Sequence, residues 1–467
     1  MSRVTTSATV CLVALSLAGC LTYAQRTEEV VDSLLAGRPD AAHDALLHNR
    51  ASLQPRNALL HELNLGTMSH HAGEFERSNA EFEQAYITSE DTRVGLGSLA
   101  LAQVTNPETL PYRGEDFELV LLHYYMALNY LSLGDLENAL VEARRINIRL
   151  SAFNQEYGDY PNRYTVDAFA TWVSGMIYEA AGEYNDAFIA YRNAYDTYVN
   201  QYVSLFGTEP PTQLEYDLIR SAAKSGLSDE KEYYERRFGM TYQPDPPGSA
   251  YIIALWHTGL GPVKTETSFN FFVVRNQGGG MAFVNSELGI SVPIASVSSS
   301  EAAQLSDLRV VRVAFPRYEE RVPRVTHATV ATNGEEWPVE LAEDVNAIAF
   351  TSLEDRAVRE MASVLLRLAF KQIAEAAARR QNPDLGTVVG IANAITERAD
   401  TRNWQTIPHS IYVTRIVVRP GDVKLQLATD DRRSDTANRL QEITIAPGET
   451  RFVYWHTLST YPAGVYR

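Results

Sequence analysis

The strongest constraint on this chain is a spacing that recurs three times between residues 66 and 182. In each occurrence a small residue is followed seven positions later by a glycine. The three pairs are Gly66 with Gly73, Ala127 with Gly134, and Gly175 with Gly182. A small residue lets two helix backbones approach closely, and a glycine just past a helix adopts the left-handed conformation that ends it. The spacing therefore predicts three antiparallel helix pairs, each with a glycine in its turn.

The residues around these pairs are similar to the tetratricopeptide pattern, which repeats about every 34 residues. The third unit is nearest to that pattern, with Gly175, Tyr178, Gly182-Glu183-Tyr184, Ala187, Tyr191 and Ala194. Successive units lie 61 and 48 residues apart, so insertions at about 93–119 and 154–167 separate them. Partial units around 37–46 and 214–226 flank the set. Generic antiparallel helices are the alternative, and both interpretations predict a short α-solenoid.

The chain changes character at residues 243–248, where three prolines cannot continue a helix. Beyond them, alternating runs such as 250–256 and 267–274 predict strands. A capping pattern at 351–354 and helical periodicity predict one long helix near 352–380. Its buried stripe is Val358, Met361, Leu365, Leu368 and Ala369. The predicted fold class is therefore multidomain α and α+β: a tetratricopeptide-like solenoid over 20–242, a Pro-rich linker over 243–248, and a β-rich α+β domain over 249–467.

The first 19 residues have the form of a signal peptide. Arg3 gives a positive start, and the apolar run 8–18 is shorter than the ~20 residues that span a bilayer. The run ends in Leu17-Ala18-Gly19-Cys20, which resembles the lipobox of bacterial lipoproteins and makes Cys20 the lipid acceptor. The alternative is an ordinary signal peptide with a chance cysteine. Leu21, in place of an aspartate, indicates the outer membrane by the sorting rule of enteric bacteria.

The cysteine content and the net charge restrict the cellular location of the chain and the partners that it can bind. The chain has two cysteines, Cys11 and Cys20, so cleavage and acylation would leave a body without a thiol or a disulfide. The formal charge of −17 argues against binding nucleic acid and against broad contact with anionic lipid. We therefore expect a periplasm-facing protein of the outer membrane, held by acyl chains such as palmitate.

No motif predicts a reaction. His61 lacks the second histidine of a zinc-protease helix, and the pair His70-His71 precedes a turn glycine, where solvated polar residues are common. The segment 259–264 lacks the ending of a phosphate-binding loop, and no Gly-x-Ser-x-Gly elbow occurs. We therefore expect no metal, no cofactor and no catalytic residue.

Two surfaces are candidates for binding. The first helix of each tetratricopeptide unit lines the concave face, where apolar residues would form a groove for a helix or peptide. The groove residues are Tyr124, Leu128, Phe169, Trp172 and Met176. Alternatively, an inserted helix or the C-terminal domain fills that groove. The second surface is a basic stripe of Arg356, Arg359, Arg367 and Lys371, for which a solvated face is the commoner outcome.

Four segments are similar to a family of proteobacterial outer-membrane lipoproteins with tetratricopeptide-like repeats. The segments are 111–131, 141–145, 255–264 and 399–408, which cover parts of both halves in order. The resemblance implies a role in envelope assembly and no particular reaction. It singles out Glu142, Arg144, Arg145, Asp400, Arg402 and Trp404. The structural alternatives are that the two arginines pair with neighbouring helix acids and that the tryptophan plugs the sheet.

These observations predict a lipid-anchored scaffold or adaptor that binds an envelope protein through the concave groove. On this hypothesis, alanine at both Tyr124 and Trp172 abolishes binding and leaves the fold intact. One alternative is an enzyme, or a glycan- or small-ligand-binding protein, with its site around Lys264 and residues 400–404. Another is a structural subunit of a large envelope assembly.

Overall fold

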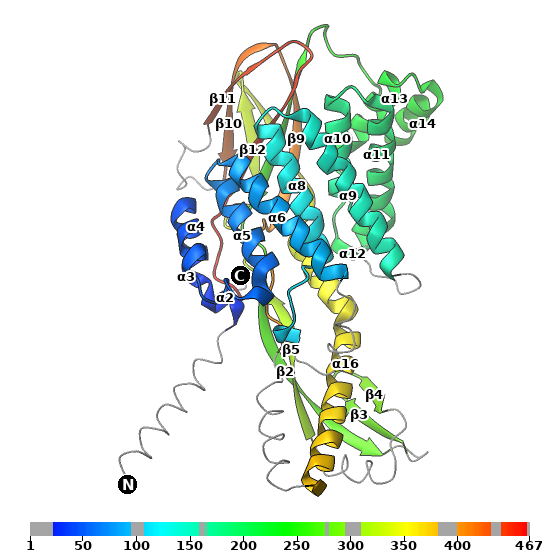
Figure 1. Ribbon diagram of the computed structural model, residues 1–467. Coiled ribbons are helices and arrows are strands. Elements are labelled where there is room, and N and C mark those ends of the chain that lie inside the picture. Colours follow the sequence, from blue (N-terminus) through cyan, green and yellow to red (C-terminus); the bar gives the residue numbers. More distant parts are fainter. Residues whose placement is uncertain are drawn as a thin grey trace.

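The structure is a computed structural model that describes residues 22–94, 107–157, 164, 166–275, 280–294, 310–381, 399–430 and 440–464. The predicted signal peptide, residues 1–19, and Cys20 lie outside the described residues. Figure 1 shows the helical half beside the sheets, with one long helix and a β-ribbon projecting from the body.

Antiparallel helix pairs make up the N-terminal half. Three pairs correspond to the predicted units: α5 (Ala58–His71) with α6 (Phe75–Val94), α8 (Asp116–Ser132) with α9 (Leu136–Tyr157), and α10 (Ala168–Ala180) with α11 (Tyr184–Thr197). The predicted flanking units are α3 (Glu28–Leu35) with α4 (Pro39–His48), and α13 (Thr212–Lys224) with α14 (Ser228–Phe238). Shorter elements are α2 (Tyr23–Arg26), α12 (Val203–Phe206), the 3-10 turns η1 (Pro55–Asn57) and η3 (Pro107–Thr109), and the π-helical turn η4 (Tyr198–Tyr202). The predicted tetratricopeptide-like solenoid is confirmed.

The glycines take the roles that their spacing predicts. The turn glycines have left-handed φ angles, which are 77° at Gly73, 75° at Gly134 and 79° at Gly182. At the helix crossing, a Cβ added to Gly175 would stand 2.5 Å from Cε1 of Tyr191. A larger residue at Gly175 would therefore force the two helices apart.

Three four-stranded sheets make up the described part of the C-terminal half. The first has the order β12 (Thr450–Thr457), β1 (Ala250–Thr258), β9 (Ser410–Val418) and β8 (Glu340–Asp344). The second has the order β11 (Leu440–Ile445), β10 (Gly421–Thr429), β6 (Ala328–Thr332) and β7 (Glu335–Pro338). The third has the order β4 (Ile290–Ile294), β3 (Met281–Asn285), β2 (Val263–Arg275) and β5 (Val310–Glu319). Strands β1 and β12 pair in parallel, and the other described pairs are antiparallel.

The long helix α16 (Val345–Gln381) begins seven residues before the predicted start, because it follows directly on β8. Met361, Leu365 and Ala369 are buried against the third sheet, as predicted. Val358 is 58% exposed, so its predicted burial is wrong; the sheet does not cover the helix at that residue. In Figure 1, α16 runs beside the projecting ribbon of β2 and β5.

One hydrophobic core joins the two halves of the chain. Leu128 and Trp172 of the solenoid belong to the same buried cluster as Ile253, Leu255 and Ile411 of the first sheet. The Pro-rich residues 243–248 carry neither helix nor strand. They connect two halves that pack directly against each other. None of the described helices combines the length and apolar character needed to cross a bilayer.

Candidate functional site

The concave face of the solenoid is closed. The five residues predicted to line an open groove, Tyr124, Leu128, Phe169, Trp172 and Met176, are at most 2% exposed. The hydroxyl of Tyr124 is hydrogen-bonded to His257 Nε2 at 2.7 Å, and Trp172 Nε1 donates to Asp217 Oδ2 at 3.0 Å. The prediction of an open groove is therefore wrong, and the alternative in which the C-terminal half fills it is correct. Alanine at both Tyr124 and Trp172 would remove core packing, so we now expect this double variant to destabilise the fold.

The segment 399–409 completes this closure, with Trp404 inserted among solenoid side chains. The indole ring lies 5.7 Å from the ring of Tyr125, centre to centre, and its Nε1 donates to Thr67 Oγ1 at 3.0 Å. The backbone N–H of Trp404 donates to Glu118 Oε1 at 2.7 Å. Trp404 therefore fills the solenoid groove, whereas the structural alternative drawn from the sequence had it plugging the sheet.

The remaining candidates in the C-terminal half, Lys264, Asp400 and Arg402, form ion pairs at the same interface, where Lys264 and Arg402 are buried and Asp400 is half-buried. Lys264 Nζ contacts Glu115 Oε1 at 2.6 Å, and Arg402 Nη2 contacts Asp400 Oδ2 at 2.6 Å. Arg402 also donates to the carbonyl oxygen of Leu110 at 2.9 Å. These charges are matched within the protein, and their contacts are those of an interface between the two halves.

The interface contains two glutamates whose pKa values are shifted in opposite directions. Burial would raise the pKa of Glu115, but Arg356 and Lys264 outweigh it and lower the pKa to about 2. Burial and the negative charge of Glu115 raise the pKa of Glu118 to about 7. Arg356 pairs with Glu115, so this member of the predicted basic stripe is an interface residue rather than part of a solvated face.

His70 and His71 belong to a histidine cluster that also contains His257 of β1 and His456 of β12. Ring centres lie 4.9 Å apart for His71 and His456, and 5.5 Å apart for His257 and His456. The expectation that the pair is solvated is wrong, because the first sheet covers this end of α5. Each ring has a buried nitrogen without a hydrogen-bond partner among the described residues.

Burial lowers the pKa of every histidine in the cluster. The pKa falls to about 4 for His70 and His456, and well below the ordinary value for His71 and His257, where neighbouring imidazoles add to the effect. The four rings are therefore neutral at pH 7. No group of three or more histidine, cysteine or acidic side chains in the described ranges is arranged to hold a metal ion.

Glu142 and Arg145 make structural contacts, and those of Arg145 are the pairs with neighbouring helix acids that the structural alternative proposed for the two arginines. Glu142 is buried and contacts His123 at 2.8 Å, and Arg145 Nη1 contacts Glu83 at 2.9 Å. Arg144 pairs with Glu183 at 3.3 Å but remains 54% exposed. It lies at one end of an open hollow on the other side of the repeats.

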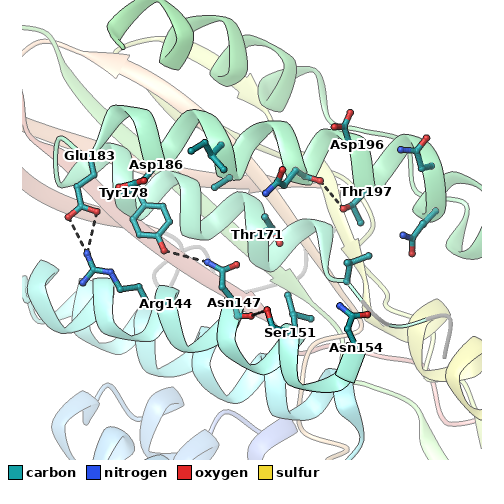
Figure 2. Close-up of a pocket in the computed structure, with 17 residues that line it drawn as sticks. Arg144, Asn147, Ser151, Asn154, Thr171, Tyr178, Glu183, Asp186, Asp196 and Thr197 are labelled. Carbon is teal, nitrogen blue, oxygen red and sulfur yellow. Dashed lines mark hydrogen bonds and ion pairs between the residues drawn. The ribbon is translucent and has the colours of Figure 1, made fainter. Parts of the chain in front are cut away.

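This hollow, which we call the outer groove, has a volume of about 790 Å³ and lies between α9 and α11 (Figure 2). In Figure 2, Arg144 and Glu183 stand at one end, and Asn154 and Thr197 lie toward the other. The two helices therefore run in the same direction along its walls. Five primary amides line it: Asn147, Asn154, Asn193, Asn200 and Gln201.

The amides follow the helical repeat on each wall. Asn147 and Asn154 are seven residues apart on α9, as are Asn193 and Asn200 on the opposite wall, where the chain passes from α11 into η4. Residues seven apart share a helix face. Sequence reasoning missed this site because it assigned binding to the first helix of each pair, although the amide spacing was readable.

Comparison with known proteins adds little to this geometry. No family profile matches the chain, and no curated protein sequence does. Among solved structures, MamA is 15% identical over 44% of this chain and 90% of its own, with a TM-score of 0.27. The apo form of RapI is 12% identical over 50% of this chain and 58% of its own, with a TM-score of 0.33. A Podosopora anserina protein with nearly identical TPR-like repeats is 14% identical over 45% of this chain and 90% of its own, with a TM-score of 0.29. Scores this low support no conclusion about function.

Proposed function

We propose that this chain is a lipid-anchored scaffold of the cell envelope, tethered through Cys20 and offering its outer groove to a protein partner. The observation that carries the proposal is the contrast between the two faces of the repeats. Solenoids commonly bind partners on an extended concave surface. Here the chain's own C-terminal half occupies that surface, and the outer groove is bordered by exposed side chains such as Ser151 and Asn193.

The proposed anchor lies three residues before Tyr23, which is buried and begins α2. Three extended residues span at most about 11 Å. Acylation of Cys20 would therefore hold the first helices close to the membrane surface, and Leu21 favours the outer membrane as that surface. The lipobox-like Leu17-Ala18-Gly19-Cys20 supports this part of the proposal.

The proposal assigns no catalytic step to the chain. At the competing site around Lys264 and residues 400–404, Lys264 is paired with Glu115, Arg402 with Asp400, and the backbone N–H of Trp404 bonds to Glu118. No observation therefore favours an enzyme or a ligand site there.

The tether is tested by metabolic labelling with radioactive palmitate and by fractionation. We expect label in the wild-type protein, and we expect a Cys20→Ser variant to take up no label and to leave the membrane fraction. An unlabelled wild-type protein, or a Cys20→Ser variant that still pellets with envelopes, would refute the anchor.

The groove is tested by placing a photo-crosslinking amino acid at Asn193 or Ser151 in living cells. We expect an adduct with one envelope protein from both positions. The same amino acid at Lys424, which is exposed on β10 of the second sheet, serves as the control and should give no such adduct. If the groove positions crosslink no more than Lys424, the outer groove is not the partner site.

A further inference from the structure

The chemistry of the outer groove points to one kind of ligand. A primary amide offers two N–H donors and a carbonyl acceptor, which matches the paired N–H and C=O groups of a peptide main chain. The side chains of Asn193 and Asn200 make no hydrogen bond within the described residues, so these groups are available. The walls therefore suit a ligand whose main chain is itself unpaired.

The hydrogen-bonding chemistry of the amides distinguishes an extended peptide from a helix, and their spacing is compatible with an extended chain. Residues seven apart on an α-helix, such as Asn147 and Asn154 on α9, are separated by about 10.5 Å along its axis. That distance corresponds to about three residues of an extended chain at ~3.3 Å each. A helical ligand has already satisfied its main-chain groups internally, so the amides would find few partners on it. The unpaired amides of Asn193 and Asn200 therefore favour an extended segment, whose main-chain groups are free to bond to them.

The charges of the groove favour a basic segment. Arg144 is paired with Glu183 at 3.3 Å, so its charge is balanced. Asp186 and Asp196 are both exposed on α11, and neither has an ion-pair partner within the described residues. A lysine or arginine on the ligand would supply that partner.

A glycan fits these walls less well, although amides also bind sugars. Sugar sites commonly offer the open face of an aromatic ring. Of the described residues that line the groove, Tyr178 is the single aromatic. It is 8% exposed, and its hydroxyl accepts a hydrogen bond from Asn147 at 3.4 Å. Its ring is therefore not available as a platform.

The C-terminal end of the groove has an unusual backbone. Asn200 and Gln201 lie in the π-helical turn η4 that follows α11. Such turns are rare and are frequently found at functional sites. Within this turn the side chains of Tyr198 and Tyr202 are buried, whereas Asn200 between them is exposed.

We infer that the outer groove binds an extended basic peptide segment of the partner, through main-chain hydrogen bonds to Asn193 and Asn200 and an ion pair with Asp186 or Asp196. This inference rests on the proposed function and names the chemistry of the ligand at the same site.

The test uses the full-length protein in detergent and an array of immobilised 12-residue peptides of random sequence, followed by fluorescence anisotropy on those selected. We expect the selected peptides to carry lysine or arginine without a helical pattern. Asn193→Ala with Asn200→Ala should weaken binding about tenfold, since two hydrogen bonds are lost. Asp186→Asn with Asp196→Asn should remove the preference for basic peptides.

Matched controls separate the groove from the rest of the helix. Asn185 is an exposed amide on α11, and Glu137 is an exposed acid at the start of α9; both lie outside the groove. The variants Asn185→Ala and Glu137→Gln should therefore leave the affinity for the selected peptides unchanged. Methylating the main-chain nitrogens at the centre of a selected peptide should abolish binding. If methylation has no effect, or if glycan fragments bind and basic peptides do not, the inference is overturned. A crosslinked partner at Asn193 in cells together with no peptide binding would refute this inference alone, whereas absent crosslinks would refute the proposed function.

Discussion

The first and second helices of the same repeats differ in what covers them. Of the 17 residues in α8, 14 are buried, and 11 of the 13 in α10 are buried. In α11, by contrast, six of 14 residues are buried. A helix buried on all sides serves an internal core, whereas one with a polar face remains at a surface. The two faces of one solenoid therefore have separate tasks: one assembles the protein, and the other is exposed.

The largest expected effect comes from reopening the concave face. Trp404→Ala should lower the free energy of unfolding by about 3–5 kcal/mol, because it leaves a cavity among Phe82, Tyr125 and Thr67. Chemical denaturation measures this loss. Trp404→Phe retains a ring and loses the bond to Thr67, so it should cost about 1 kcal/mol. A Trp404→Ala variant of wild-type stability would show that the groove is not filled as described.

Low pH should lower the free energy of unfolding through the histidine cluster, which lies where the first sheet covers α5. In the unfolded chain an imidazole titrates near pH 6.5, whereas burial lowers the pKa of His70 and His456 to about 4 in the folded protein. The unfolded state therefore takes up protons first as pH falls. The contribution of these two neutral histidines to the free energy of unfolding is fully present above about pH 6.5 and is lost as the pH falls toward 4. Between pH 7 and pH 5 the free energy of unfolding should fall by about 2 kcal/mol per histidine.

A double variant isolates this contribution from other titrating groups. Glu118, with its pKa raised to about 7, acts in the opposite direction, so wild-type behaviour alone is not decisive. His70→Asn can keep the bond to Asn129, and His456→Gln can keep the bond to the Gly259 carbonyl. The double variant should lose about 3–4 kcal/mol less free energy of unfolding between pH 7 and pH 5 than the wild-type protein does, as measured by urea unfolding. His48→Gln, at an exposed position, is the control. If the free energy of unfolding changes equally with pH in the wild-type protein, the double variant and the control, the prediction is contradicted.

A smaller effect is expected where the two helix types cross. Gly175→Ala places a Cβ 2.5 Å from Tyr191, whose hydroxyl is held by Glu179 at 2.8 Å. Overpacking of this kind costs about 1–3 kcal/mol. Gly280→Ala would place its Cβ more than 4 Å from the atoms of the described residues beyond its chain neighbours, and should be neutral. Thermal unfolding of the two variants would separate a steric effect from a general intolerance of glycine replacement.

The smallest effect on stability should come from the outer groove. Asn193→Ala is expected to change the free energy of unfolding by less than about 0.5 kcal/mol, because the residue is exposed and makes no side-chain hydrogen bond in the described part of the chain. Any larger loss would mean that the groove is part of the folded core. Such a result would remove the contrast between the two faces.

Sequence alone determined the helix pairs of this protein. The turn glycines, the small residues at the crossings and the aromatic Tyr191 are local features within about 20 residues of one another, and the helical period fixes how they meet. The α+β character of the second half was equally readable from alternating strands. The start of α16 was misplaced because the signal that was read, a capping pattern, lies inside the helix.

Only the tertiary structure decided which face of the solenoid is open. The bond from Trp404 to Thr67 joins residues 337 positions apart, and no local period encodes such a contact. An apolar stripe looks the same in sequence whether a partner or the chain's own C-terminal half covers it, because burial of apolar area is non-directional. The histidine cluster was hidden for the same reason, since α5, β1 and β12 meet only in the folded protein.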